Sequence, residues 1–184
     1  MAVLNETRFQ WSPLHSICNV LSNLKKVMDD TVSLATRVAT RIIHANNDAS
    51  LICDTRGYTP LSLAISLARP DRTLCTDFAS VLIRESDPAA LSTEDDGGNT
   101  PIHIAVSVGN ARLTRELLIR GSYGASWNHD GEAPIHIVAK SGNSKLLKVG
   151  SSLPPPLLEN IHSQRFCAGT RRGRMSSEPT HRVR

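Results

Sequence analysis

The residues of this sequence that could do chemistry are histidines, cysteines and paired carboxylates, and their spacing favours a structural role. His103 and His136 occupy the same place in two copies of one motif, which is typical of a side chain that holds a repeat together. Asp29–Asp30 and Asp95–Asp96 resemble the carboxylate pairs used in acid–base catalysis, but loop carboxylates are usually solvated. We therefore predict no catalytic residue and no enzymatic activity.

Metal and cofactor sites are not indicated either. The four cysteines, Cys18, Cys53, Cys75 and Cys167, contain no CxxC pair, and no histidine stands at a ligand spacing from them. We interpret them as reduced thiols of a cytosolic or nuclear protein, with a disulfide framework as the less favoured alternative. The glycines at 97–98 do not belong to a GxGxxG or GxxxxGK[ST] pattern. We expect no metal, no cofactor and no small-molecule substrate.

The charge of the chain is unevenly placed. Residues 1–148 hold 15 Lys and Arg against 15 Asp and Glu, whereas residues 149–184 hold 6 Arg against 2 Glu. The formal net charge of +4 therefore belongs entirely to the C-terminal segment. The sequence contains no apolar run long enough to span a membrane, and its first residues do not have the pattern of a secretory signal.

One motif recurs along the chain and explains most of its apolar pattern. The segment "GNTPIHIAVSVGN" (98–110) returns as "GEAPIHIVAKSGN" (131–143), 33 residues later. Related copies are "GYTPLSLAISLAR" (57–69) and "WSPLHSICNVLSN" (11–23). In the copies at 57–69, 98–110 and 131–143 a turn glycine precedes the helix start. All four copies have a Thr-Pro-like start, and apolar residues then follow at helical spacing. A second helix is predicted over 111–122, so the unit is turn, helix, turn, helix.

This pattern resembles the ankyrin repeat. Residues 95–122 meet the family pattern almost in full, residues 54–68 match with Ser62 in place of the motif histidine, and residues 128–145 match the first half of a further unit. Residues 11–45 form a degenerate first unit. The resemblance implies an all-α ankyrin-repeat solenoid over 11–148, in which the motif histidine bonds to the turn. Because Ala133 replaces the threonine in the last copy, His136 should be held less firmly than His103.

Two regions depart from the pattern. The unit from 54 to 94 is eight residues too long, and we expect 68–77 to be a stretched connection between its helices, with two further residues in the following loop. At the other end, the last unit loses its apolar pattern at Lys148, and Gly150 with Pro154, Pro155 and Pro156 should end the helix. We expect marginal stability there, unless residues 156–166 fold back as a substitute cap.

Residues 149–184 are predicted to be a disordered tail, since they combine several Arg with few apolar residues and no period. The tail could be natural, or the product of an alternative exon or a retained intron. Its basic cluster 171–177, "RRGRMSS", could touch phosphate or act as a nuclear import signal.

The function that the resemblance implies is protein–protein interaction in the cytoplasm or nucleus, in signalling or transcription regulation. The partner would lie in a concave groove formed by hairpin tips and first helices. Two alternatives are nucleic-acid association through the basic tail and a truncated splice isoform acting as a decoy. The residues at the family's variable surface positions, together with Trp127, are the predicted partner-binding residues: Thr55, Arg56, Tyr58, Ser66, Leu67, Asp96, Gly97, Asn99, Ser107, Val108, Trp127, His129, Asp130, Glu132, Lys140 and Ser141. Trp127 is the strongest single candidate, because tryptophan is enriched at binding hot spots; the alternative is that it covers a neighbouring repeat.

Overall fold

The computed structural model describes residues 12–23, 29–122 and 126–151, and within them it is built of helices and turns without a β-strand. The all-α prediction is therefore confirmed. The α-helices are α1 (Pro13–Asn23), α2 (Asp29–Ala45), α3 (Pro60–Leu67), α4 (Thr73–Glu85), α5 (Pro101–Val108), α6 (Ala111–Ile119), α7 (Pro134–Ser141) and α8 (Ser144–Ser151), and two short 3₁₀ helices cover Asn47–Ser50 and Pro88–Leu91.

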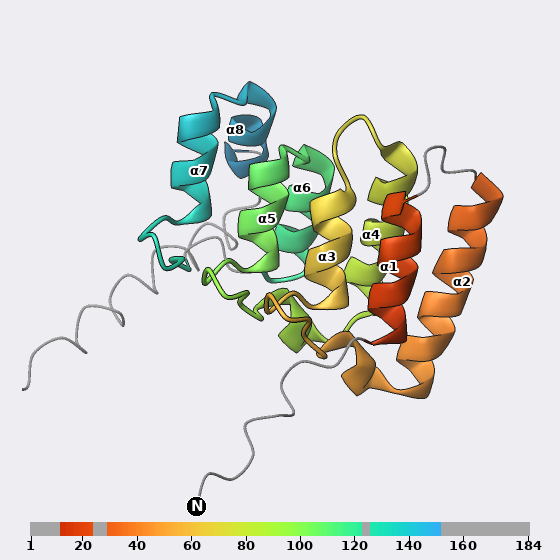
Figure 1. Ribbon diagram of the computed structural model, residues 1–184. Coiled ribbons are helices and arrows are strands. Elements are labelled where there is room, and N and C mark those ends of the chain that lie inside the picture. Colours follow the sequence, from red (N-terminus) through yellow and green to blue (C-terminus); the bar gives the residue numbers. More distant parts are fainter. Residues whose placement is uncertain (1–11, 24–28, 123–125, 152–184) are drawn as a thin grey trace, which may run out of the picture.

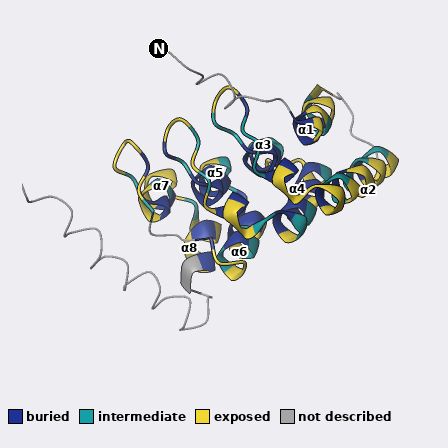
Figure 2. Ribbon diagram, turned by 90° about the horizontal axis from the view of Figure 1, so that it is seen from below, coloured by how far each residue is buried: buried dark blue, intermediate teal, exposed yellow. Residues whose placement is uncertain are grey.

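The helices form two parallel rows, as Figure 1 shows. The first row contains α1, α3, α5 and α7, each in contact with the next, and the second row contains α2, α4, α6 and α8. Each first helix with its following second helix is one unit, and we name these the first, second, third and final unit. The hairpin turns that precede α3, α5 and α7 project together from one side of the first row (Figure 2). This is the solenoid arrangement that the repeat pattern predicted.

Each first helix begins at a proline for a local reason. Proline lacks an N–H group, which would have no partner in the first turn of a helix, and its fixed φ suits that position. The residue before it caps the helix in the second unit, where the Ser62 N–H donates to Thr59 Oγ1 (3.2 Å). Gly109 ends α5 in the left-handed conformation, with φ of 82°. The boundaries predicted from the motif therefore match the observed helices closely.

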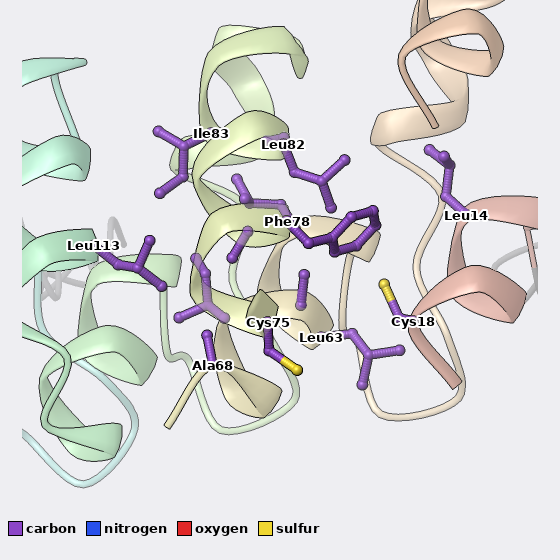
Figure 3. Packing of buried hydrophobic residues seen from close by; sticks show 14 of the residues in the cluster. Leu14, Cys18, Leu63, Ala68, Cys75, Phe78, Leu82, Ile83 and Leu113 are labelled. Atoms are coloured by element: carbon purple, nitrogen blue, oxygen red, sulfur yellow. The ribbon is translucent and has the colours of Figure 1, made fainter. Parts of the chain in front are cut away.

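The core lies between the two rows. Its largest cluster runs from α1 to α6, and the helices turn their buried residues toward each other (Figure 2). Figure 3 shows Phe78 of α4 directed toward Leu14 and Cys18 of α1. A separate small cluster of Val106, Val138 and Leu146 joins the third unit to the final one. The final unit is thus attached by far fewer buried side chains than the units before it.

The long second unit differs from its predicted form. The connection between its helices covers only residues 68–72, because α4 already begins at Thr73. Compared with the third unit, three of the eight extra residues lie in this connection, four lengthen the second helix and one lies in the following loop. The prediction of a stretched connection over 68–77 was therefore wrong in its extent. The buried Asn110 amide of the next unit supports the connection by donating to the Ala68 carbonyl (2.7 Å) and Thr76 Oγ1 (2.9 Å).

The last helix also extends beyond its predicted stop. α8 continues to Ser151, and Val149 is buried at 4% exposure. Glycine inside a helix costs only about 1 kcal/mol relative to alanine, so Gly150 alone does not end the helix as a proline would. The three prolines, the possible cap at 156–166 and the basic cluster at 171–177 lie outside the described residues. None of the described helices is long and apolar enough to cross a membrane.

Candidate partner-binding surface

The hairpin turns before α3, α5 and α7 are shaped by one acceptor side chain each. Asp95 Oδ1 accepts from the N–H groups of Gly97 (2.9 Å) and Asn99 (2.8 Å). Asp54 and Asn128 occupy the same position in their own hairpins and accept equivalent pairs of backbone N–H groups. Asp95, one of the two residues suspected of forming a carboxylate pair, is therefore occupied in holding its own turn.

Neighbouring hairpins are joined through their backbones. The Asp96 N–H donates to the Arg56 carbonyl (3.1 Å), and the His129 N–H donates to the Gly97 carbonyl (2.9 Å). Gly98 makes this approach possible, because its φ is +73° and an added Cβ would lie 2.9 Å from the His129 backbone nitrogen. The hairpin tips thus form one connected edge instead of independent loops.

All the predicted partner-binding residues have accessible side chains or backbone. None of them is buried. Ten are exposed: Thr55, Arg56, Asp96, Gly97, Ser107, Trp127, His129, Asp130, Lys140 and Ser141. The other six are half-buried: Tyr58, Ser66, Leu67, Asn99, Val108 and Glu132. The hairpin residues lie along the edge just described, and Ser66, Leu67, Ser107, Val108, Lys140 and Ser141 lie at the ends of α3, α5 and α7. The predicted residues therefore fall into two accessible groups, one on and beside the hairpins and one at the C-terminal ends of the first helices.

Some of these residues are fixed by contacts with each other. The Arg56 guanidinium lies over the Tyr58 ring, 4.7 Å from its centroid, and donates to Asp54 Oδ2 (3.1 Å). Burial of Asp54 would raise its pKa, but backbone N–H groups of Arg56 and Tyr58 and the Arg56 charge outweigh it and lower the pKa. In the final unit the Lys140 ammonium pairs with Glu132, and this hydrogen bond raises the pKa of Lys140.

Trp127 stands beside the last hairpin and remains 53% exposed. Its ring packs on His136 of α7, with centroids 5.1 Å apart and planes at 45°. This contact is with its own unit. The ring contacts His136 while about half of the residue stays exposed, which suits an aromatic anchor.

His103 is a structural residue, as its place in the motif indicated. It is fully buried, and its Nδ1 accepts from the Thr100 N–H (3.2 Å) and lies 2.8 Å from Thr100 Oγ1. Its Nε2 must then carry the proton, since it lies 3.1 Å from the Glu132 carbonyl, which can only accept. Burial lowers the pKa of His103, which keeps the ring neutral.

The bridge from Nε2 to the next hairpin was not foreseen in the sequence. His15 makes the same set of contacts, with Nδ1 2.8 Å from Ser12 Oγ and Nε2 2.8 Å from the Tyr58 carbonyl. The degenerate first unit therefore keeps the complete capping arrangement. The available signal is the Ser-Pro-Leu-His order at 12–15, which indicates the motif but not the long-range bond.

His136 is held by fewer contacts. It is exposed, and its Nδ1 accepts from the Ala133 N–H (3.0 Å). Ala133 has no hydroxyl to match that of Thr100, so one contact of the motif is absent. The expectation that His136 is held less firmly than His103 is confirmed.

Groups suited to chemistry are dispersed over the described part of the chain. No three His, Cys, Asp or Glu residues gather there in a way that could hold a metal ion. Burial raises the pKa of Cys18 to about 12, so its thiol stays protonated. An open cleft of about 350 Å³ lies between α6 and α8, on the second row, and Arg112, Arg115 and Lys145 line it with Glu116. Arg112 is already paired with Asp77 (2.6 Å) and Glu116 (3.2 Å).

Comparison with known proteins supports the repeat assignment. The family model of the ankyrin repeat matches residues 97–129, which contain the tip of the middle hairpin, α5, α6 and the start of the last hairpin. No curated protein matches the chain. The matched region is the copy that fits the motif best, and the resemblance drawn from the sequence is confirmed.

Proposed function

We propose that the chain binds a partner protein through the concave side of the array, at the hairpin tips and the ends of the first helices, because its best-fitting repeat, residues 97–129, matches the ankyrin-repeat family model. Ankyrin repeats are interaction modules, and the all-helical double row has the architecture of one. What carries the proposal is the connected edge of hairpins. The bonds from Asp96 to Arg56 and from His129 to Gly97 hold the tips in register while their side chains stay accessible.

A rigid edge favours binding for an energetic reason. Association costs about 0.5–1.5 kcal/mol for each rotamer-rich side chain that must be ordered. Several side chains of this edge are already restricted: Arg56 by Asp54 and Tyr58, Lys140 by Glu132, and Trp127 by His136. A partner would therefore meet a surface whose order is largely established before binding.

The test compares one variant of each face of the array. The full chain, a hairpin-face variant (Trp127→Ala with Asp96→Lys) and a second-row variant (Arg115→Ala with Lys145→Ala) are each used to isolate bound proteins, which are quantified by mass spectrometry. A partner of the concave face is retained by the second-row variant and lost by the hairpin-face variant.

The partner identified in this way is then titrated calorimetrically against all three proteins, each checked first for an unchanged thermal midpoint. We expect the hairpin-face variant to weaken binding by more than tenfold and the second-row variant to bind normally. Loss of binding in the second-row variant alone would place the interface on the opposite face and refute the proposal.

A further inference from the structure

The final unit exposes apolar positions that are buried in every earlier copy. The first apolar residue after the motif proline is Leu14, Leu61 and Ile102 in the first three units, with exposures of 1%, 0% and 2%. Its counterpart in the final unit, Ile135, is 57% exposed. All four residues are leucine or isoleucine, so the difference in exposure comes from the presence or absence of a following unit and not from the residue type.

Two further positions behave in the same way. Val106 is 2% exposed and packs with Val138, whereas Ala139, which replaces it in the final unit, is exposed. Thr114 on α6 is 4% exposed, and its counterpart on α8, Leu147, is 49% exposed. We name Ile135, Ala139 and Leu147 the open end face.

The surroundings of the hairpin glycines show where the final unit lacks a neighbour. An added Cβ on Gly57 or Gly98 would strike the next hairpin, at Asp96 or His129 respectively. The corresponding Gly131 has nothing within 4 Å. The open end face is therefore the continuation of the interface that stacks each unit on the next, and it lacks an occupant among the described residues.

We propose that residues 157–166 of this chain cover the open end face and serve as the cap of the array. The segment reads "LLENIHSQRF" and places Leu157, Leu158 and Ile161 at helical spacing. Pro156 precedes them at the position where a helix of this protein begins in every unit. Its apolar residues are aliphatic, like those that the stacking interface buries elsewhere.

The chain reaches this face without strain. α8 ends at Ser151, on the unit that carries the face, and Leu157 follows six residues later. Six extended residues span at most about 20 Å, and an eight-residue helix such as α7 or α8 is about 12 Å long. The linker is long enough to bring Leu157 to any point along these helices.

Covalent attachment favours this segment over a second copy of the chain as the occupant of the open end face. A short tether gives an effective concentration on the order of millimolar, far above that of a separate chain at ordinary concentrations. The opposite end of the array also exposes apolar residues, Val20, Leu34 and Val38. A head-to-tail contact between copies is therefore the alternative that the experiment must exclude.

The experiment is a double-mutant cycle in the full chain. Leu147→Ser and Leu158→Ser are made singly and together, and thermal midpoints are measured. Each single variant should lower the midpoint by about 3 °C or more, and the double variant should lower it by clearly less than the two shifts together, because one lost contact is counted twice. The matched control pairs Leu34→Ser with Leu158→Ser, whose shifts should add.

Amide exchange gives a local readout. Leu158→Ser should speed exchange in α7 and α8 by about tenfold, since removing one buried leucine shifts a local opening equilibrium by at least that factor. Exchange in α1 and α2 should not change. If Leu158→Ser alters neither the midpoint nor this exchange, or if the Leu147 and Leu158 effects add fully, the cap is refuted. A concentration-dependent dimer that Leu147→Ser abolishes would assign the face to a second copy instead.

Discussion

The third and final units share one motif and differ in what covers it. In the third unit His103 is fully buried and makes contacts to Thr100 and Glu132. In the final unit His136 is exposed and bonds to its own turn. The same residue type in the same place is therefore a structural bridge in one unit and a surface side chain in the next. The stability of a unit in this array depends on its neighbour, as expected of a repeat protein.

The largest effect that tests this comparison is expected from the two histidines. His103→Ala leaves a cavity and removes the partner of the half-buried Glu132 carbonyl, so we expect the free energy of unfolding to fall by about 3 kcal/mol. His136→Ala should cost less than about 1 kcal/mol, as for most surface substitutions. Urea unfolding of both variants measures the difference. Equal losses would contradict the difference in cover between the two units.

The next largest effect concerns binding. Trp127→Ala should weaken the affinity for a partner of the concave face by about 2 kcal/mol or more, the size of a hot-spot residue. Because Trp127 is half exposed and contacts His136 of its own unit, the thermal midpoint should change little. His103→Ala should show the opposite behaviour, with a lower midpoint and, below it, nearly unchanged affinity. A Trp127→Ala protein that binds as before would move the binding surface away from the last hairpin.

A smaller effect is expected from exchanging the helix caps. Ala133→Thr gives the final unit the hydroxyl that lies 2.8 Å from His103 Nδ1 in the third unit, and it should stabilise the protein by about 0.5–1 kcal/mol. Thr100→Ala should destabilise it by about 1 kcal/mol. Both changes are measured as free energies of unfolding. If Thr100→Ala lowers the free energy of unfolding but Ala133→Thr does not raise it, the threonine cap stabilises a unit only where the motif histidine is buried.

The parts of the fold that the sequence predicted are those with local causes. The Thr-Pro helix starts, the positive φ of Gly98 and the stop at Gly109 each depend on residues within one turn of the chain. The period then placed the helices in two rows, because each unit must bury its apolar face on the next. The all-helical solenoid architecture could therefore be predicted from the sequence.

The parts that were missed depend on contacts between units. The α4 helix starts within the predicted connection, where the amide of Asn110, 42 residues beyond Ala68, supports the chain. The bond from His103 to the Glu132 carbonyl spans 29 residues and has no local signal. α8 continues past Gly150, and the neighbouring Val149 is buried, which glycine propensity alone does not reveal.

For the candidate surface, the position of each residue within the repeat motif correctly indicated which residues are accessible. It did not indicate which of them contact each other. The pairing of Lys140 with Glu132 and the position of Arg56 over Tyr58 join residues whose side chains are long enough to reach several partners. Their choice is set by the packing of the hairpin against its helix, which the order of residues does not specify.

The smallest expected effect is a pH dependence that distinguishes the covered histidine. Burial lowers the pKa of His103 below the value of about 6.5 that a histidine has in an unfolded chain. As the pH falls below this value, the unfolded chain takes up the proton before the folded protein does, so the free energy of unfolding decreases until the folded pKa is reached. The stabilisation is complete above pH 6.5. We therefore expect the wild-type protein to lose stability between pH 7.5 and pH 5.5, above the range in which most carboxylates titrate.

The loss should be smaller in His103→Ala, which no longer has this group. Ile102→Ala is the matched control, because it destabilises the same covered unit and keeps the histidine, so it should retain the wild-type slope. Urea unfolding at several pH values gives the three slopes. An unchanged slope in His103→Ala would show that the buried ring takes its proton as readily in the folded protein as in the unfolded chain. The bridge to the Glu132 carbonyl would then not depend on a neutral histidine, and the contrast between the third and final units would be one of packing alone.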